Sequence, residues 1–385
     1  MYKKLITAIC LLFITHLSFA QGDSSHLRVS LLTCGAGEEI WETFGHTGVR
    51  VIDSNHHTDI VYNYGTFDGY DKDFDIKFMK GKLLYYISYE TFAGFMREYI
   101  EAKRPVQEQI LQITGKEKQQ IDSFLKWNAQ PDNKYYKYDF YFDNCATRIR
   151  DIFPTTLGPS FHYGNILPTG RSLSFRDISD QYLYKRHWER FGIDILLGSR
   201  VDKIMSNADI MFLPDFLRNG VASATVNGKK IAADPQTILP GTDEQAGGVN
   251  QAFIVMLLVF LLTLAGLMVP SLRVLGKIMT FLLLFITGLL GWLILFMWFG
   301  TDHQACQNNY NVLWALPTNL ILAYLNKRNK NKYAVLGIIL ILISLLLHVL
   351  HIQKLPLLEL MPLLLSLLMV YGTIYRKNYK NDIAS

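Results

Sequence analysis

Residues 278–299 read IMTFLLLFITGLLGWLILFMWF, a run that holds no charged side chain. A helix of about 20 apolar residues crosses the hydrocarbon core of a bilayer, so this run predicts a transmembrane helix. Similar runs lie on both sides of it, and together they predict about five spans, at 252–270, 278–299, 312–326, 333–352 and 356–375. Pro317 and Asn319 interrupt the third run, which makes it the least regular of the five.

The basic residues between these runs predict the orientation of the chain in the membrane. Lysine and arginine are concentrated in the connections 271–277 and 326–332 and in the tail 376–385. The other two connections contain a single basic residue, Lys354. Basic connections stay in the cytoplasm, so five spans place the chain before residue 252 on the opposite side.

The first 20 residues carry the features of an export signal. Lys3 and Lys4 precede a short apolar stretch, 5–17, which ends in the small-x-small sequence Ser18-Phe19-Ala20. This arrangement is typical of a signal peptide cleaved after Ala20, and it agrees with the orientation predicted from the basic connections. The chain is therefore expected to divide into a signal peptide (1–20), an exported periplasmic domain (21–240), a linker (241–251), a transmembrane domain (252–375) and a cytoplasmic tail (376–385).

The composition excludes several classes of protein. The 385 residues are 50% hydrophobic and 18% charged, which is too apolar for a single soluble domain or a disordered chain. The net charge of +5 is modest, and much of the basic charge beyond residue 270 flanks apolar runs, unlike a nucleic-acid-binding surface. Removal of Cys10 with the signal leaves Cys34, Cys145 and Cys306, which are too scattered to form a disulfide framework.

The exported domain has the sequence pattern of an α+β fold. Strands are expected at 27–33, 46–52, 59–64 and 83–89, which are β-prone and partly alternating. Helices are expected at 91–102, after the capping box Thr114-Gly-Lys-Glu117, and at 146–153, where Pro154 would end the last one.

Two motifs in this domain can carry chemistry. The sequence FGHTGVRV at 44–51 places His46 at the start of a strand, and YFDNCATR at 141–148 places Cys145 in the first turn of a helix. A helix N-terminus lowers the pKa of a thiol, and a neighbouring imidazole favours the thiolate further. This is the geometry of papain-like thiol chemistry, with histidine before cysteine as in circularly permuted members.

The supporting residues of such a site remain open. Tyr64, Asn63 and Glu42 are candidates for the third member that orients the imidazole, and spacing does not choose among them. Asn144 and Arg148 are candidates to support a tetrahedral oxyanion. No cysteine–histidine pair has zinc spacing and no nucleotide or nucleic-acid motif is visible, so no metal, cofactor or nucleic-acid partner is expected.

The same residues have structural interpretations. Cys145 can be a small core residue, and His46 a hydrogen-bonded structural histidine. Cys34 ends a β-prone stretch and either packs in the core or supplies a second thiol near His46. The polar loop 302–309, which contains His303, either lines the site or is a plain interfacial loop. The aromatic stretch 135–142 is either core or an acyl-chain groove.

Several strings resemble a known family. The strings LLTCG at 31–35, FGHT at 44–47, DNCATR at 143–148 and MFLPD at 211–215 are similar to the Lnb N-terminal periplasmic domain family of Bacteroidetes, over residues 25–230. The string NVLWALP at 311–317 resembles the membrane portion that accompanies this domain. The resemblance implies a lipoprotein N-acyltransferase with a circularly permuted core, similar to NlpC/P60 or lecithin–retinol acyltransferase proteins. It implies His46 as the base and Cys145 as the acyl-accepting nucleophile, and it fixes neither the third member nor a role for Cys34.

These features together predict a multi-pass protein of the bacterial inner membrane with its N-terminal domain in the periplasm. The predicted reaction moves an acyl chain from a phospholipid, through a Cys145 thioester, to the α-amine of a diacylglyceryl-cysteine lipoprotein. The expected partners are the phospholipid acyl donor, the diacylated lipoprotein acceptor and the bilayer itself. Two other classes stay open: a cell-wall cysteine peptidase or amidase, and a non-catalytic membrane scaffold.

Overall fold

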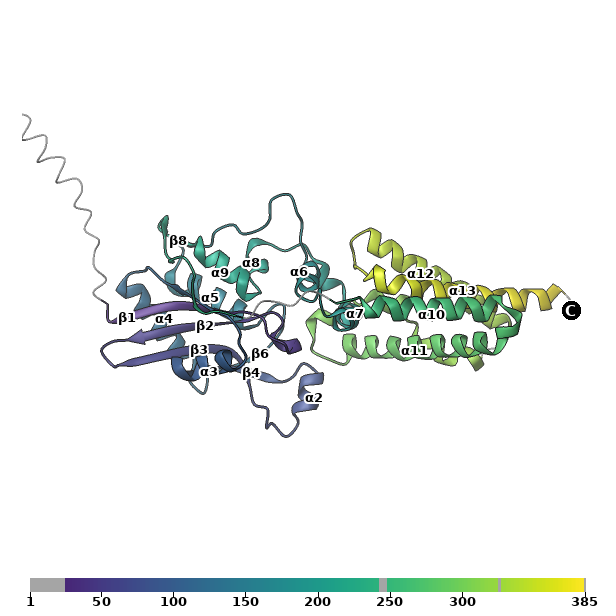
Figure 1. Cartoon of the computed structure of the whole chain (residues 1–385), viewed down its shortest axis with the longest axis horizontal. Coiled ribbons are helices and arrows are strands. Elements are labelled where there is room, and N and C mark those ends of the chain that lie inside the picture. Colours follow the sequence, from purple (N-terminus) through teal and green to yellow (C-terminus); the bar gives the residue numbers. More distant parts are fainter. Residues whose placement is uncertain (1–24, 242–247, 325–326, 384–385) are drawn as a thin grey trace, which may run out of the picture.

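The computed structural model describes residues 25–241, 248–324 and 327–383 and shows an elongated molecule with two parts (Figure 1). A domain of strands and short helices forms one end, and a bundle of long helices forms the other. The expected signal peptide, 1–20, lies outside the described residues, as do residues 242–247 of the expected linker.

A seven-stranded sheet, antiparallel throughout, forms the centre of the first part. In spatial order its strands are β10 (Gln236–Leu239), β5 (Val106–Ile110), β1 (Leu27–Cys34), β2 (His46–Asp53), β3 (Thr58–Phe67), β4 (Leu84–Thr91) and β6 (Tyr135–Lys137). A second, three-stranded sheet contains β7 (Phe161–His162), β8 (Thr225–Val226) and β9 (Lys229–Lys230). Strands β2 and β3 pair antiparallel, with Gly48 opposite Asn63.

Helices cover both faces of the large sheet, which explains why β1 is buried at nearly every position. Leu31 packs in a cluster with Leu125 of α4 and Ile149 of α5, whereas its neighbour Leu32 packs with Phe95 of α3 on the other face. The helices and 3-10 turns of this part are η1 (Ile40–Glu42), α2 (Phe74–Met79), α3 (Phe92–Glu101), α4 (Gly115–Asn128), α5 (Cys145–Leu157), α6 (Phe175–Tyr182), α7 (His187–Leu196), η2 (Ser199–Asp202), α8 (Asn207–Ile210) and α9 (Pro214–Ala222). The α+β class predicted from the sequence is confirmed.

The expectation that Pro154 ends its helix is wrong. Helix α5 continues through Pro154 to Leu157 and stops at Gly158, whose φ is 76°. Proline lacks the N–H that would bond the carbonyl four residues earlier, which belongs to Arg150. The hydroxyl of Tyr163 donates to that carbonyl at 2.7 Å instead, so the helix loses one bond without leaving its acceptor unpaired.

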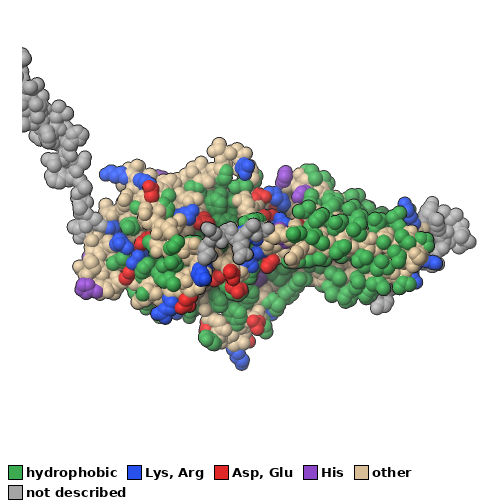
Figure 2. Space-filling view, in the orientation of Figure 1, with side chains coloured by type: hydrophobic (Ala, Val, Ile, Leu, Met, Phe, Trp, Pro, Cys, Tyr) green, Lys and Arg blue, Asp and Glu red, His purple; other side chains and the backbone are tan. Residues whose placement is uncertain are grey.

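Long apolar helices form the second part of the molecule. They are α10 (Gln251–Met268), α11 (Arg273–Phe299), α12 (Lys327–Val349) and α13 (Leu357–Ile383), joined through η3 (Pro270–Leu272), η4 (Gln304–Cys306), η5 (Tyr310–Leu313) and η6 (Pro317–Tyr324). Within the described residues, four helices are long and apolar enough to cross a membrane. Figure 2 shows hydrophobic side chains covering this bundle, with lysine and arginine at its far end.

The expected third span, 312–326, is not a long helix. Its described part consists of the 3-10 turns η5 and η6, and it packs along α11, where Gly288 and Gly291 admit it closely. Pro317 interrupts α-helical hydrogen bonding. Asn319 is buried, and its amide donates to the Thr287 hydroxyl at 3.0 Å, which offsets the cost of burying a polar group. A 3-10 helix rises about 2.0 Å per residue, against about 1.5 Å in an α-helix. A 3-10 segment is therefore longer than an α-helix with the same number of residues.

The two parts of the molecule are joined by polar contacts, one buried and one partly buried. Asn309 is fully buried, and its amide donates to the carbonyls of Ile195 (2.8 Å) and Leu196 (2.9 Å) at the end of α7. Lys354, between α12 and α13, donates to Asp177 of α6 at 2.6 Å. These bonds hold the α+β domain on one end of the bundle, next to both connections on that side.

Candidate active site

Cys145 is the first residue of α5 because Asn144 caps this helix. The Asn144 side chain accepts from the backbone N–H of Thr147 at 2.9 Å, and the Thr147 hydroxyl accepts from the Asn144 N–H at 2.7 Å. This reciprocal pair is a capping box, which fixes the start of the helix. The thiol therefore lies at the positive end of the helix dipole. Cys145 retains 9% exposure, so it is nearly covered.

The amide of Asn144 is fully engaged in holding the preceding loop. It donates to the carbonyls of Phe140 at 2.6 Å and Phe212 at 2.8 Å. Both amide hydrogens are thus committed, so Asn144 acts as an anchor for the loop rather than as a donor to an oxyanion. Arg148 is likewise held: its guanidinium pairs with Asp143 at 2.6 Å and covers the Tyr136 ring at 4.1 Å.

His46 begins β2 directly after a tight turn at Gly45. The φ of Gly45 is 72°, and a Cβ there would lie 2.6 Å from the Cys34 carbonyl oxygen, so the turn requires glycine. The turn brings the imidazole of His46 into hydrogen-bond contact with the Cys145 thiol. The other side of the ring is occupied, because His46 Nε2 contacts Asn63 Oδ1 on β3. This leaves Nδ1 for the thiol.

The charges of the pair reinforce each other. Burial opposes ionisation of Cys145, yet the pKa of its thiol is lowered, because the charge and hydrogen bond of His46 favour the thiolate. The backbone N–H groups of Thr47 and Ala146 also donate to the thiolate. Burial opposes the charged form of His46 as well, but Cys145 and Asn63 together raise the pKa of the imidazole. The arrangement favours a thiolate–imidazolium pair, the reactive form of a cysteine nucleophile.

Only one of the three candidates for the third member contacts His46 in the described structure. Asn63 does so because the β2–β3 register places it opposite Gly48, two residues along the strand from His46. The Tyr64 hydroxyl donates to Asn128 instead, and Glu42 pairs with Arg104 at 2.9 Å. The arrangement Cys145–His46–Asn63 therefore has the order of contacts seen in a thiol triad.

The other cysteines lie in environments that suppress ionisation. Cys34 is opposite His46 in the β1–β2 register, but its side chain is buried beside Phe95 and Tyr99. Burial raises the pKa of Cys34 to about 12, and burial likewise raises the pKa of Cys306 to about 12. Neither thiol shares the electrostatic environment of Cys145.

His303 lies at the junction between the two parts of the molecule rather than against Cys145. Its Nε2 is 3.2 Å from the carbonyl oxygen of Met79, and the N–H of Asp302 donates to the Lys80 carbonyl at 2.8 Å. The loop 302–309 thus holds the end of α2 and, through Asn309, the end of α7. Sequence reasoning missed this role, and it also missed the backbone donor at Thr47, since a backbone group on a strand leaves no signal in residue type.

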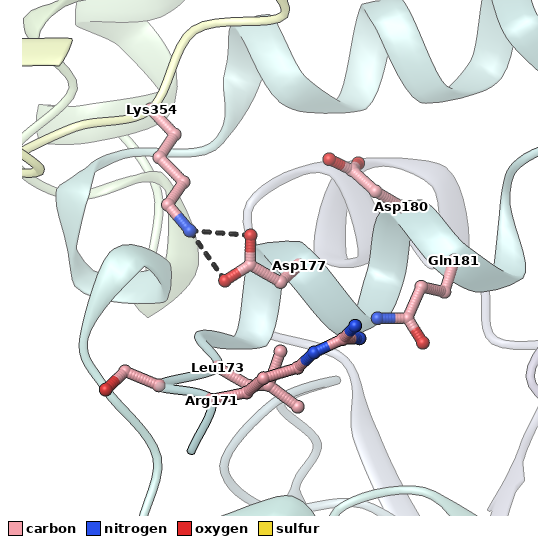
Figure 3. Close-up of a pocket in the computed structure, with 7 residues that line it drawn as sticks. Arg171, Leu173, Asp177, Asp180, Gln181 and Lys354 are labelled. Carbon is pink, nitrogen blue, oxygen red and sulfur yellow. Dashed lines mark hydrogen bonds and ion pairs between the residues drawn. The ribbon is translucent and has the colours of Figure 1, made fainter. Parts of the chain in front are cut away.

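A separate hollow of about 380 Å³ lies between α6 and the connection that carries Lys354 (Figure 3). Its lining is polar and includes Arg171, Asp177 and Asp180. The residues that line it do not include Cys145, His46 or Asn63, so this hollow is distinct from the thiol site. Among the residues that the structure describes, no cluster of three or more His, Cys, Asp or Glu side chains could hold a metal ion.

Fold and site together define a multi-pass membrane protein whose α+β domain holds a paired cysteine and histidine. Residues 16–178 match the Lnb N-terminal periplasmic domain, and residues 247–382 match the Lnb transmembrane domain. The chain belongs to the Lnb family, since both parts match the same family and together span most of the sequence. This membership suggests a membrane protein of lipoprotein processing with a periplasmic N-terminal domain. Comparisons with curated proteins and with solved structures gave no match.

Proposed function

We propose that this protein is a lipoprotein N-acyltransferase of the inner membrane that works through a thioester on Cys145. The observation that carries the proposal is the contact between the Cys145 thiol and the His46 imidazole, with Asn63 on the far side of the ring. The order of histidine and cysteine also fits the circularly permuted papain-like core that the family resemblance implies. The family assignment supports lipoprotein processing as the setting for this chemistry.

In the first half of the reaction, the Cys145 thiolate attacks the ester carbonyl of a phospholipid. The tetrahedral oxyanion is stabilised by N–H groups of the first turn of α5 other than that of Thr147, which the Asn144 cap binds, because the first N–H groups of a helix have no backbone partner within it. When the intermediate collapses, the ester C–O bond breaks and the imidazolium of His46 gives its proton to the leaving alcohol. The products are a lysophospholipid and a thioester on Cys145.

In the second half, the α-amine of a diacylglyceryl-cysteine lipoprotein attacks the thioester carbonyl. His46 accepts the amine proton, and the C–S bond breaks to return the Cys145 thiolate. The products are the N-acylated lipoprotein and the original thiolate–imidazolium pair. Atoms and charges balance without a metal or a cofactor.

The attachment of the α+β domain to the bundle supports a substrate held in a membrane. Asn309 and Lys354 bind the domain to the end of the helices, and both lie in connections on the extracytoplasmic side of the predicted topology. Donor and acceptor in the proposed reaction are both lipids anchored in the outer leaflet. A cell-wall peptidase or amidase acts on a substrate outside the membrane, so its reaction does not require the domain to be held against the helices.

The proposal is tested by mass spectrometry of lipoprotein N-termini from cells with and without the protein. Wild-type cells should carry a third acyl chain on the N-terminal cysteine, and cells lacking the protein should carry diacylated lipoproteins with a free amine. Complementation with wild type should restore the third chain, and complementation with Cys145→Ser should not. Fully N-acylated lipoproteins in cells that lack the protein, with no other enzyme induced, would contradict the proposal.

A further inference from the structure

A row of aromatic side chains connects α2 with the site. Phe78 stacks on Phe74 at 5.9 Å between ring centroids, and Phe74 is 5.5 Å from Phe67. Phe67 contacts Tyr85 at 5.3 Å, and Tyr85 stacks on Tyr138 at 4.4 Å. We call these five residues, on α2, β3, β4 and the segment after β6, the aromatic row.

The inner end of the aromatic row lies near Cys145. A Cβ built on Gly65 would lie 4.0 Å from the ring of Tyr138 and 4.0 Å from Cβ of Cys145. Because Gly65 has no side chain, nothing from this residue separates the ring from the nucleophile. Tyr85 and Tyr138 are only partly buried, so they remain accessible beside the site.

The outer end of the aromatic row is exposed and apolar. Phe78 is 54% exposed and Phe67 is 44% exposed, and Ile76 and Met79 of the same short helix are also exposed. Apolar side chains gathered in this way usually mark a binding surface, because exposure to water is unfavourable for each of them.

The position of α2 next to the bundle identifies the medium that this end faces. The carbonyls of Met79 and Lys80, at the end of α2, contact His303 and Asp302 in the loop that follows α11. Figure 1 shows α2 projecting from the sheet beside that end of the bundle. Aromatic residues at the ends of membrane-spanning helices lie at the level of the lipid headgroups. The exposed end of the aromatic row therefore lies beside the end of the bundle from which the loop after α11 emerges (Figure 1).

We propose that the aromatic row binds the acyl chain of the lipid donor, which enters at α2 from the outer leaflet and extends to Cys145. This inference rests on the proposed function and adds the route that the chain takes. Successive rings lie 4.4 to 5.9 Å apart, so an alkyl chain laid along the row would pass from contact with one ring to contact with the next. Flat aromatic faces contact a flexible alkyl chain without requiring a specific polar pattern, which suits a lipid.

The test compares two electrophiles with the same reactive group, iodoacetamide and N-hexadecyl iodoacetamide, on the full-length protein in detergent. Labelling of Cys145 is measured at about pH 9, where even an ordinary thiol is largely ionised. Chain selectivity is then measured whether or not His46 activates the thiol, so a failure of the proposed chemistry and a failure of the chain route give different results. The readout is the ratio of the long-chain rate to the short-chain rate.

The double variant Phe67→Ser, Phe78→Ser should lower this ratio by about tenfold, because two large apolar contacts with the chain are lost. Both side chains are about half exposed, so their removal leaves the core intact. Phe78→Ser alone, on the exposed helix α2, should lower the ratio by a smaller factor. This single variant replaces the double variant in the test if the loss of Phe67 disturbs β3. The matched control is Tyr89→Ser, an exposed aromatic residue on the same strand as Tyr85, which should keep the wild-type ratio.

Partition of the long reagent into micelles is common to all variants and cancels in the comparison. If the double variant and the single variant Phe78→Ser both kept the wild-type ratio, the chain route would be overturned. An equal fall in Tyr89→Ser would also overturn it, because the effect would then not belong to the aromatic row.

Discussion

The thiol of Cys145, at the first residue of α5, meets the imidazole of His46, at the first residue of β2. The two residues come from distant parts of the chain and are each preceded by a residue that sets the backbone: the helix cap Asn144 and the turn residue Gly45. Each is also bonded to a partner beyond the pair, since Asn63 contacts the ring and backbone N–H groups contact the sulfur. The reactivity proposed for Cys145 depends on all of these contacts.

Replacement of either member of the pair should abolish acyl transfer. Cys145→Ser removes the ionisable thiol, because a serine hydroxyl has no accessible anion at neutral pH, and His46→Ala removes the proton acceptor. The double variant should be no worse than either single variant, since the two residues act as a unit. Transfer is measured on lipoprotein N-termini, with the unfolding temperature as a check on the fold. Activity retained in Cys145→Ser would end its assignment as the nucleophile.

Asn63→Ala should lower the rate of transfer by about a hundredfold, because the imidazole loses the partner that orients it. We expect Asn63 to act as a positioning residue, because it contacts the His46 ring and helps to raise the pKa of His46. The alkaline side of the pH–rate profile should therefore move to lower pH in Asn63→Ala, which a merely structural defect would not cause.

The matched control for Asn63→Ala is Tyr64→Phe at the adjacent position. Tyr64 bonds Asn128 rather than His46, so its loss should lower stability but leave the pH–rate profile in place. If Tyr64→Phe moved the profile and Asn63→Ala did not, the identity of the third member would have to be reassigned.

The thiolate of Cys145 should persist at a pH where ordinary thiols are protonated. Its pKa is lowered and that of His46 is raised, and both shifts favour the thiolate–imidazolium pair. The contribution of the lowered Cys145 pKa is lost as pH falls through its folded-state value, and that of His46 is lost as pH rises through its raised value. At about pH 6.5, where an ordinary thiol is only about 1% ionised, iodoacetamide should label Cys145 faster than Cys34 or Cys306.

Burial also slows the labelling of Cys34 and Cys306, so the decisive comparison is within Cys145 itself. His46→Ala should slow its labelling at pH 6.5 by about tenfold, because the positive neighbour is gone, and unfolding should remove the difference. An unchanged rate in His46→Ala would mean that the imidazole does not activate this thiol.

Much of the architecture could be predicted from residue pattern, and the failures have physical causes. Apolar runs and basic connections depend on local composition, so the four long membrane helices were predictable. Most of the described part of the segment 312–326 is 3-10 structure, stabilised by contacts of Asn319 with other helices, which a hydropathy pattern does not contain. Pro154 was expected to end α5, but its missing bond is compensated by Tyr163, which comes later in the chain.

The site was predictable in part for similar reasons. The positions of Cys145 at a helix start and His46 at a strand start follow from local signals, the cap at Asn144 and the glycine before the histidine. The choice of Asn63 over Tyr64 and Glu42 depends on the register between β2 and β3, and a register is a property of the folded sheet. The role of the loop 302–309 depends on the docking of two parts of the molecule and has no counterpart in residue type.

The compensation at Pro154 gives a prediction about stability. Tyr163→Phe keeps the ring but removes the donor to the Arg150 carbonyl, so it should destabilise the domain by about 1 kcal/mol. The measurement is the unfolding temperature of the full-length protein. Tyr184→Phe, at a largely exposed tyrosine, is the control and should leave that temperature unchanged. Equal unfolding temperatures for Tyr163→Phe and wild type would show that water satisfies the Arg150 carbonyl equally well.

The central claim, that Cys145 carries the acyl chain during transfer, is tested most directly by trapping the acyl-enzyme. Purified protein is incubated with phospholipid in the absence of any acceptor, and the peptide that contains Cys145 is analysed by mass spectrometry. The account predicts one acyl chain on this cysteine, released by neutral hydroxylamine or by an added diacylglyceryl-cysteine peptide, and no acyl chain on Cys34 or Cys306. An unmodified Cys145 in protein that still N-acylates the added peptide would contradict it.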